Sequence, residues 1–81
     1  MANGKKRNLS LVSVVQAERD GRTVVDQQTE APMVRGYTGG VDWVCGACRR
    51  VLVAHDDAQP APNYDEVLMR CLCGAINRPP R

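Results

Sequence analysis

The chain has 81 residues, with no Phe, one Trp and two Tyr, so its hydrophobic core must be small. A core of this size rarely supplies more than roughly 3–5 kcal/mol, and natural domains this short usually add disulfides or a metal ion. The 11 basic and 9 acidic residues give a formal net charge of +2, which is not in itself a nucleic-acid-binding signature. No apolar run approaches the ~20 residues of a membrane span, so we expect no membrane association.

The first third of the chain is rich in valine and carries one turn signal. Residues 9–16 and 24–28 are predicted as two strands joined through Asp20-Gly21, a dipeptide typical of tight hairpins. The alternative is a short amphipathic helix that breaks at Gly21. Lysines and an arginine precede 9–16 as in a secretory signal, but the apolar run is short and contains serines. We therefore expect a cytoplasmic protein.

Four cysteines form two closely spaced pairs. Cys45 and Cys48 have C-x-x-C spacing, whereas Cys71 and Cys73 have C-x-C spacing. Each pair follows a valine-rich stretch, and a glycine in or after each pair lets backbone N–H groups approach the sulfurs. Zinc takes four such ligands in a tetrahedron, and clustered cysteines in a reducing compartment are typical metal ligands. We predict one structural Zn²⁺ held by all four, with iron or metal-free thiols and disulfides as the alternatives.

The stretch 43–77, WVCGACRRVLVAHDDAQPAPNYDEVLMRCLCGAIN, resembles a zinc ribbon. In that family two cysteine knuckles lie at the ends of β-hairpins around one structural zinc. The resemblance implies that the first pair is one knuckle and the second pair is the other. The second pair departs from the family pattern, because one residue separates its cysteines where the family usually has two. If this spacing keeps one sulfur from the metal, His55 is the reserve ligand; otherwise we expect His55 to be a solvated surface residue.

These patterns predict a small, mostly β fold, with zinc-ribbon hairpins and an N-terminal hairpin or flexible arm. The order of segments along the chain is a flexible basic N-terminus at 1–8, a β-hairpin or partly ordered arm and linker at 9–36, a zinc-ribbon domain at 37–78 and a tail at 79–81.

The chain is not expected to be an enzyme. A catalytic zinc keeps one coordination position open and usually has a His ligand, whereas four cysteines fill the coordination sphere. The sequence has one His, no nucleophile motif and no Gly-rich phosphate loop. The carboxylates of 56–66 accompany two prolines and indicate a solvated loop. We therefore expect no small-molecule substrate.

The expected function is binding within a nucleic-acid-associated assembly. Basic residues flank both cysteine pairs and an aromatic residue precedes the first, so arginines could contact phosphates while the indole stacks on a base. The candidate contact residues are Arg49, Arg50, Arg70, Arg78 and Trp43. The alternative role of these arginines is to offset the charge of the zinc thiolates.

Two other functions remain open. The chain could be a protein-interaction adaptor, which would use the edge of the 9–28 hairpin or the C-terminal RPPR sequence. It could also be a thiol redox switch that releases zinc on oxidation. We expect a monomer in each case.

Overall fold

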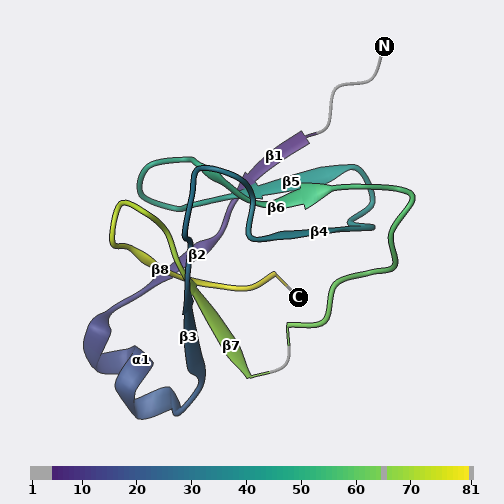
Figure 1. Ribbon diagram of the computed structural model, residues 1–81. Helices are drawn as coiled ribbons and strands as arrows, with labels where there is room; N and C mark the ends of the chain where they lie inside the picture. The colour runs from purple at the N-terminus through teal and green to yellow at the C-terminus, as the bar shows by residue number, and fades with distance from the viewer. Residues whose placement is uncertain (1–4, 65, 81) are drawn as a thin grey trace.

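The chain folds into two four-stranded sheets joined by its N-terminal segment (Figure 1). The computed structural model describes residues 5–64 and 66–80. One sheet, the first sheet, has the strand order β1-β5-β6-β4, and the second sheet has the order β2-β8-β7-β3. The elements are β1 (Lys5–Asn8), β2 (Ser10–Val12), α1 (Val14–Asp20), β3 (Thr23–Asp26), β4 (Val34–Gly36), β5 (Val41–Val44), β6 (Val51–His55), β7 (Val67–Arg70) and β8 (Ile76–Arg78). The prediction of a small, mostly β fold is confirmed.

The N-terminal segment belongs to both sheets. Strand β1 pairs in parallel with β5, and β2 pairs antiparallel with β8. Between them Leu9 is buried, and its backbone N–H donates to the carbonyl of Val44 at 2.9 Å. Figure 1 shows this purple segment passing from one sheet to the other. The prediction of a flexible N-terminus over 1–8 is therefore wrong for 5–8, and residues 1–4 lie outside the described part of the chain.

The predicted hairpin over 9–28 is wrong, because a helix occupies its middle. Ser13 caps α1: its Oγ accepts from the backbone N–H of Gln16, whose side chain accepts from the N–H of Ser13. This capping box favours a helix over a strand. Gly21, at φ 73°, takes the left-handed conformation that closes a helix C-terminus. Asp20-Gly21 thus ends a helix, and β2 and β3 pair with β8 and β7 rather than with each other.

The other segments outside 37–78 also join the fold. Strand β4, from the predicted linker, pairs in parallel with β6. Pro79, from the predicted tail, is buried, and Arg81 lies outside the described residues. An interaction edge on a 9–28 hairpin is therefore not available in the form expected for an adaptor.

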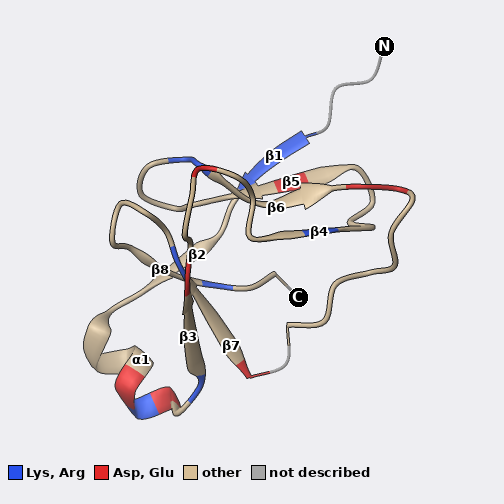
Figure 2. Ribbon diagram, viewed as in Figure 1, with Lys and Arg blue, Asp and Glu red and all other residues tan. Residues whose placement is uncertain are grey.

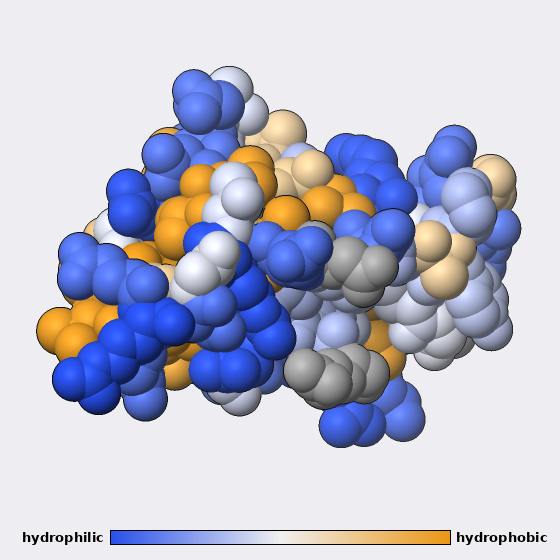
Figure 3. All heavy atoms as spheres, turned by 90° about the horizontal axis from the view of Figure 1, so that it is seen from below, coloured by the Kyte–Doolittle hydropathy of each residue, from blue (hydrophilic) through white to orange (hydrophobic). Residues whose placement is uncertain are grey.

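Two apolar clusters form the core. The larger one joins the sheets around Leu9, Leu52, Val53 and Met69, together with two of the cysteines. The smaller one contains Ala17 of α1 and residues of the second sheet. Figure 3 views the molecule from the side of α1 and shows apolar patches divided by hydrophilic residues. Within the described chain, no helix has the length and apolar character needed to cross a membrane.

Candidate metal centre

Each cysteine pair lies in the turn of an antiparallel hairpin. Cys45 and Cys48 lie between β5 and β6 of the first sheet. Cys71 and Cys73 lie between β7 and β8 of the second sheet. The two turns meet, so each sheet contributes two sulfurs to one cluster. This arrangement of two hairpin knuckles is the one expected from the sequence.

The sulfur positions fit a four-coordinate metal ion. All four Sγ atoms lie within 4.8 Å of one another, with Cys48 and Cys71 at 3.3 Å and Cys45 and Cys73 at 3.7 Å. Four sulfurs at ~2.3 Å from a tetrahedral zinc lie about 3.8 Å apart, whereas the sulfurs of a disulfide lie about 2.05 Å apart. The cluster is therefore compatible with a four-cysteine zinc site. The C-x-C spacing of Cys71 and Cys73 allows both of their sulfurs to join the cluster.

Two backbone hydrogen bonds close each turn, and the turn of the second knuckle is one residue shorter. In the first, the N–H of Cys45 donates to the carbonyl of Arg50 at 2.8 Å. The N–H of Arg49, a residue with a φ of 68°, donates to the carbonyl of Cys45 at 3.0 Å. In the second, the N–H of Cys71 donates to the carbonyl of Ala75 at 2.9 Å, and the N–H of Gly74 donates to the carbonyl of Cys71 at 2.8 Å. Gly74 has a φ of 96°, a backbone conformation that residues with a side chain rarely adopt. Glycine there lets the shorter pair close its turn.

Two buried amide side chains hold the knuckles in place. Asn77, fully buried in β8, accepts from the N–H of Gly46 at 2.9 Å and donates to the Sγ of Cys45 at 3.5 Å. Gln27, 5% exposed, accepts from the N–H of Leu72 at 3.1 Å. Neither residue was predicted from the sequence to contact the cysteine knuckles. Asn77 carried a weak signal, as a polar residue close behind the second pair, whereas Gln27 carried none.

The environment separates the four thiols into two kinds. Burial raises the pKa of Cys45, but hydrogen bonds from the backbone of Cys48 and Ala47 and from Asn77 and Cys73 outweigh it and lower the pKa to about 6. A backbone hydrogen bond from Arg50 is the main cause that lowers the pKa of Cys48. Burial raises the pKa of Cys71 to about 12. Without metal, Cys45 is therefore an anionic thiolate near neutral pH, and a metal ion must displace the proton of Cys71.

The predicted contact arginines do not form one cluster. The Nη1 of Arg50 donates to the Sγ of Cys48 at 3.6 Å, and its Nε lies 3.9 Å from the carboxylate of Glu30. This arginine therefore contacts the cysteine cluster. Arg70 forms an ion pair with Asp26 at 3.2 Å. Arg49 is exposed in the first knuckle.

Trp43 and Arg78 lie together in a different place, at a hollow beside Pro79 and Pro80. Of the five predicted contact residues, the structure thus places these two beside the same hollow.

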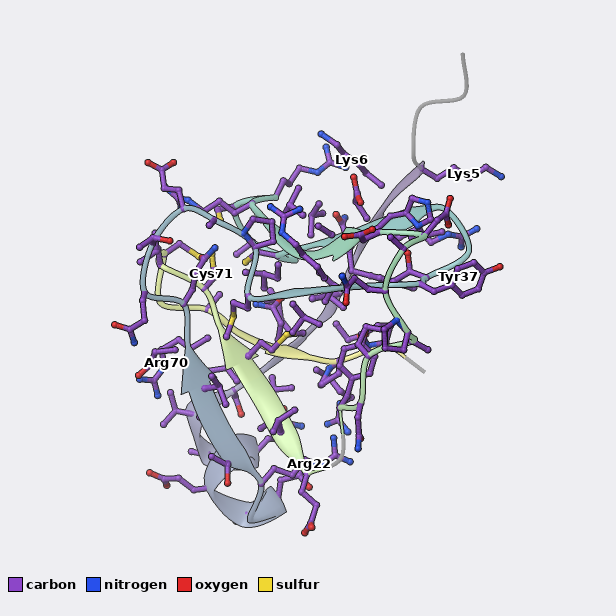
Figure 4. The ribbon with its side chains drawn as sticks, turned by 45° about the vertical axis from the view of Figure 1, so that its right-hand side comes forward. Lys5, Lys6, Arg22, Tyr37, Arg70 and Cys71 are labelled. Carbon is purple, nitrogen blue, oxygen red and sulfur yellow. The ribbon has the colours of Figure 1, made fainter. Side chains whose placement is uncertain are left out.

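His55 is not part of the cysteine group. Its Nε2 lies 3.1 Å from the carboxylate of Asp57, and its Nδ1 accepts from the N–H of Gly40 at 3.2 Å. The described residues contain one group of metal-binding side chains with suitable spacing, and this group is the four cysteines. Figure 4 shows Cys71 beside other sulfurs on one flank, with Lys5 and Tyr37 toward the opposite flank.

Comparisons of the chain with protein-family models, with curated proteins and with solved structures give no match. The assignment of a metal centre therefore rests on the geometry of the four sulfurs and on the chemistry of thiolate ligands.

Proposed function

We propose that the four cysteines hold one structural Zn²⁺ and that the chain is a non-enzymatic binding module of the zinc-ribbon type. The observation that carries this proposal is the convergence of four sulfurs, two from each sheet, within 4.8 Å. Four thiolates saturate zinc and leave no coordination position for water or substrate. Bound zinc would cross-link the sheets and contribute roughly 10–16 kcal/mol, more than a core this small supplies.

Removal of the metal tests the structural role. A strong chelator should remove the β-sheet signal from the far-UV circular dichroism spectrum and collapse the dispersed amide resonances of 41–78. Added zinc should restore both. Spectra that stay unchanged after verified zinc removal would contradict the proposal. A His55→Ala variant is the matched control, since its zinc content and its response to the chelator should equal those of the wild type.

The partner that we propose is nucleic acid, within a nucleoprotein assembly. Support comes from basic residues that form no ion pair with any carboxylate of the described residues, among them Lys5, Lys6, Arg7 and Arg49. Figure 2 shows β1 in blue because its first three residues, Lys5, Lys6 and Arg7, are basic, and all four residues of the strand are exposed. Unpaired cations on an edge strand suit phosphate contacts and also discourage strand-to-strand aggregation.

Oligonucleotide titration of the zinc-loaded chain tests this partner. Binding at low salt that weakens steeply as salt is raised is the expected result, because phosphate contacts release counterions. An absence of binding at low salt would refute the nucleic-acid role and leave the structural zinc proposal intact.

A further inference from the structure

A hollow of about 260 Å³ lies between β5, the C-terminal end of β8 and the junction of β1 with β2. Trp43 and Arg78 line it, together with Pro79, Pro80 and the stretch 8–10. None of its described lining residues is acidic. One aromatic residue and one arginine, both partly buried, therefore line the same small space.

Strand pairing explains why these residues meet. Arg7 is in register with Trp43 across the β1–β5 pair, and Ser10 is in register with Arg78 across the β2–β8 pair. The segment that joins the two sheets thus runs past both, and it extends the basic edge strand β1 to the rim of the hollow. Arg78 forms no ion pair with a carboxylate of the described residues, so its charge is available to a ligand.

A second hollow of about 450 Å³ adjoins the first, because Pro79 and Pro80 line both. Tyr64 and Arg22 contribute to it, although Arg22 also pairs with Asp20 at 3.5 Å and Glu66 lies in the same lining. Two concave sites, each with one aromatic residue and one arginine, therefore follow each other across the two prolines. Pro79 is buried and Pro80 is partly exposed, so Pro80 is the one of the two prolines that a ligand crossing between the hollows would contact.

This combination matches single-stranded nucleic acid. Unpaired bases stack on aromatic side chains, while arginines contact the phosphates between them. A duplex keeps its bases inside the helix and has none to place in a hollow. The concave shape therefore favours a single strand, whereas the basic strand β1 alone would accept either form.

We propose that the Trp43 hollow binds one base of a single-stranded nucleic acid, with Arg78 at an adjoining phosphate and the strand continuing toward Tyr64. This inference rests on the nucleic-acid function proposed above and specifies its site.

The chain has one Trp, so tryptophan emission reports on Trp43 alone. Oligothymidine and oligouridine of about 12 nucleotides should quench this emission in the zinc-loaded wild type, because the indole stacks on a base. Trp43→Leu should weaken binding by about 5- to 150-fold. Trp43 and Tyr64 both pack against the core, so Arg78→Gln supplies the variant outside it, and Tyr64→Leu should give a smaller loss than Trp43→Leu.

Arg78→Gln should weaken binding and lower the slope of log affinity against log salt by about one. Arg35→Gln is the matched control, since it removes the same charge from an exposed residue of β4, at the opposite edge of the first sheet from β1, and should leave the slope near that of the wild type. Three results would each overturn the proposed binding of a base in the Trp43 hollow while the nucleic-acid function stands. They are binding that leaves Trp43 emission unchanged, equal effects of Arg78→Gln and Arg35→Gln, and a preference for duplex. No binding of any oligonucleotide at low salt would overturn both.

Discussion

The side chain of Asn77 donates a hydrogen bond to the Sγ of Cys45 at 3.5 Å, from the second sheet to the first. Its oxygen accepts from the N–H of Gly46 at 2.9 Å, so one buried amide contacts both a candidate metal ligand and the turn that presents it. Donors to thiolate sulfur offset its charge and fix its position. Asn77 therefore connects the metal centre to the packing of the two sheets.

Replacement of Asn77 by Ala should lower both stability and metal affinity. The change leaves the half-buried N–H of Gly46 and the Sγ of Cys45 without their partner, which costs about 1–3 kcal/mol of unfolding free energy. Loss of a partner to a metal ligand typically reduces metal affinity by about 10- to 100-fold. Denaturant unfolding and competition with a chromophoric chelator measure the two effects. Asn8→Ala, at an exposed position of β1, is the control, and equal results for the two variants would refute the role of Asn77.

Gln27 and its neighbour Gln28 provide a matched pair for the second knuckle. Gln27 is 5% exposed and accepts from the N–H of Leu72, whereas Gln28 is exposed. Gln27→Ala should cost about 0.5–1.5 kcal/mol of unfolding free energy, because the N–H of Leu72 in the second knuckle loses its hydrogen-bond acceptor. Gln28→Ala should stay within about 0.5 kcal/mol of the wild type. Similar unfolding midpoints for the two variants would show that the second knuckle does not depend on Gln27.

Gly46 allows the N-terminal segment to pass close to the first knuckle. A Cβ at this position would lie 2.5 Å from the carbonyl oxygen of Leu9 and 3.0 Å from Leu11, so the backbones would have to separate. Gly46→Ala should therefore destabilise the zinc-loaded chain by more than Gly39→Ala. The Gly39 site is open but has a φ of 70°, which costs about 1 kcal/mol for a side chain. Thermal unfolding compares the two, and a milder effect of Gly46→Ala would contradict the close packing.

Zinc affinity should rise with pH, because protons compete with the metal for the thiolates. Burial raises the pKa of Cys71 to about 12 in the metal-free chain, so this thiol must lose a proton when zinc binds near neutral pH. Cys45, with a pKa of about 6, is already anionic there and becomes a further site of proton competition only in acid. The stabilisation by zinc is thus present at high pH and lost as pH falls, more steeply below about pH 6. Chelator competition across this range measures the slope, and a pH-independent affinity would refute thiolate ligation.

The strands beside the cysteines could be predicted from the sequence because their pattern is local. Short apolar stretches that begin with valine predicted β5, β6 and β7, and the cysteine spacing predicted the two turns. Sheet membership was not predictable in the same way. β6 and β7 flank one loop yet belong to different sheets, and the partners of β1 and β2 lie more than 30 residues away along the chain.

The N-terminal third shows how a local signal can favour the wrong element. Valines on both sides of Asp20-Gly21 fit a hairpin, but the capping box of Ser13 and Gln16 favours a helix. The candidate ligands were predictable from residue type and spacing, whereas Asn77 and Gln27 were not. Their role comes from burial beside a knuckle, and burial depends on tertiary packing.

The metal content of the purified chain tests the central claim most directly. Elemental analysis should find one zinc per chain, and cobalt substitution should give the thiolate charge-transfer bands of a tetrahedral four-sulfur site. Single Cys→Ser variants at the four positions should weaken or alter both signals, whereas His55→Ala should leave both unchanged. A chain that binds no metal when purified and reconstituted under reducing conditions, or one whose cysteines are recovered as disulfides under those conditions, would contradict the account.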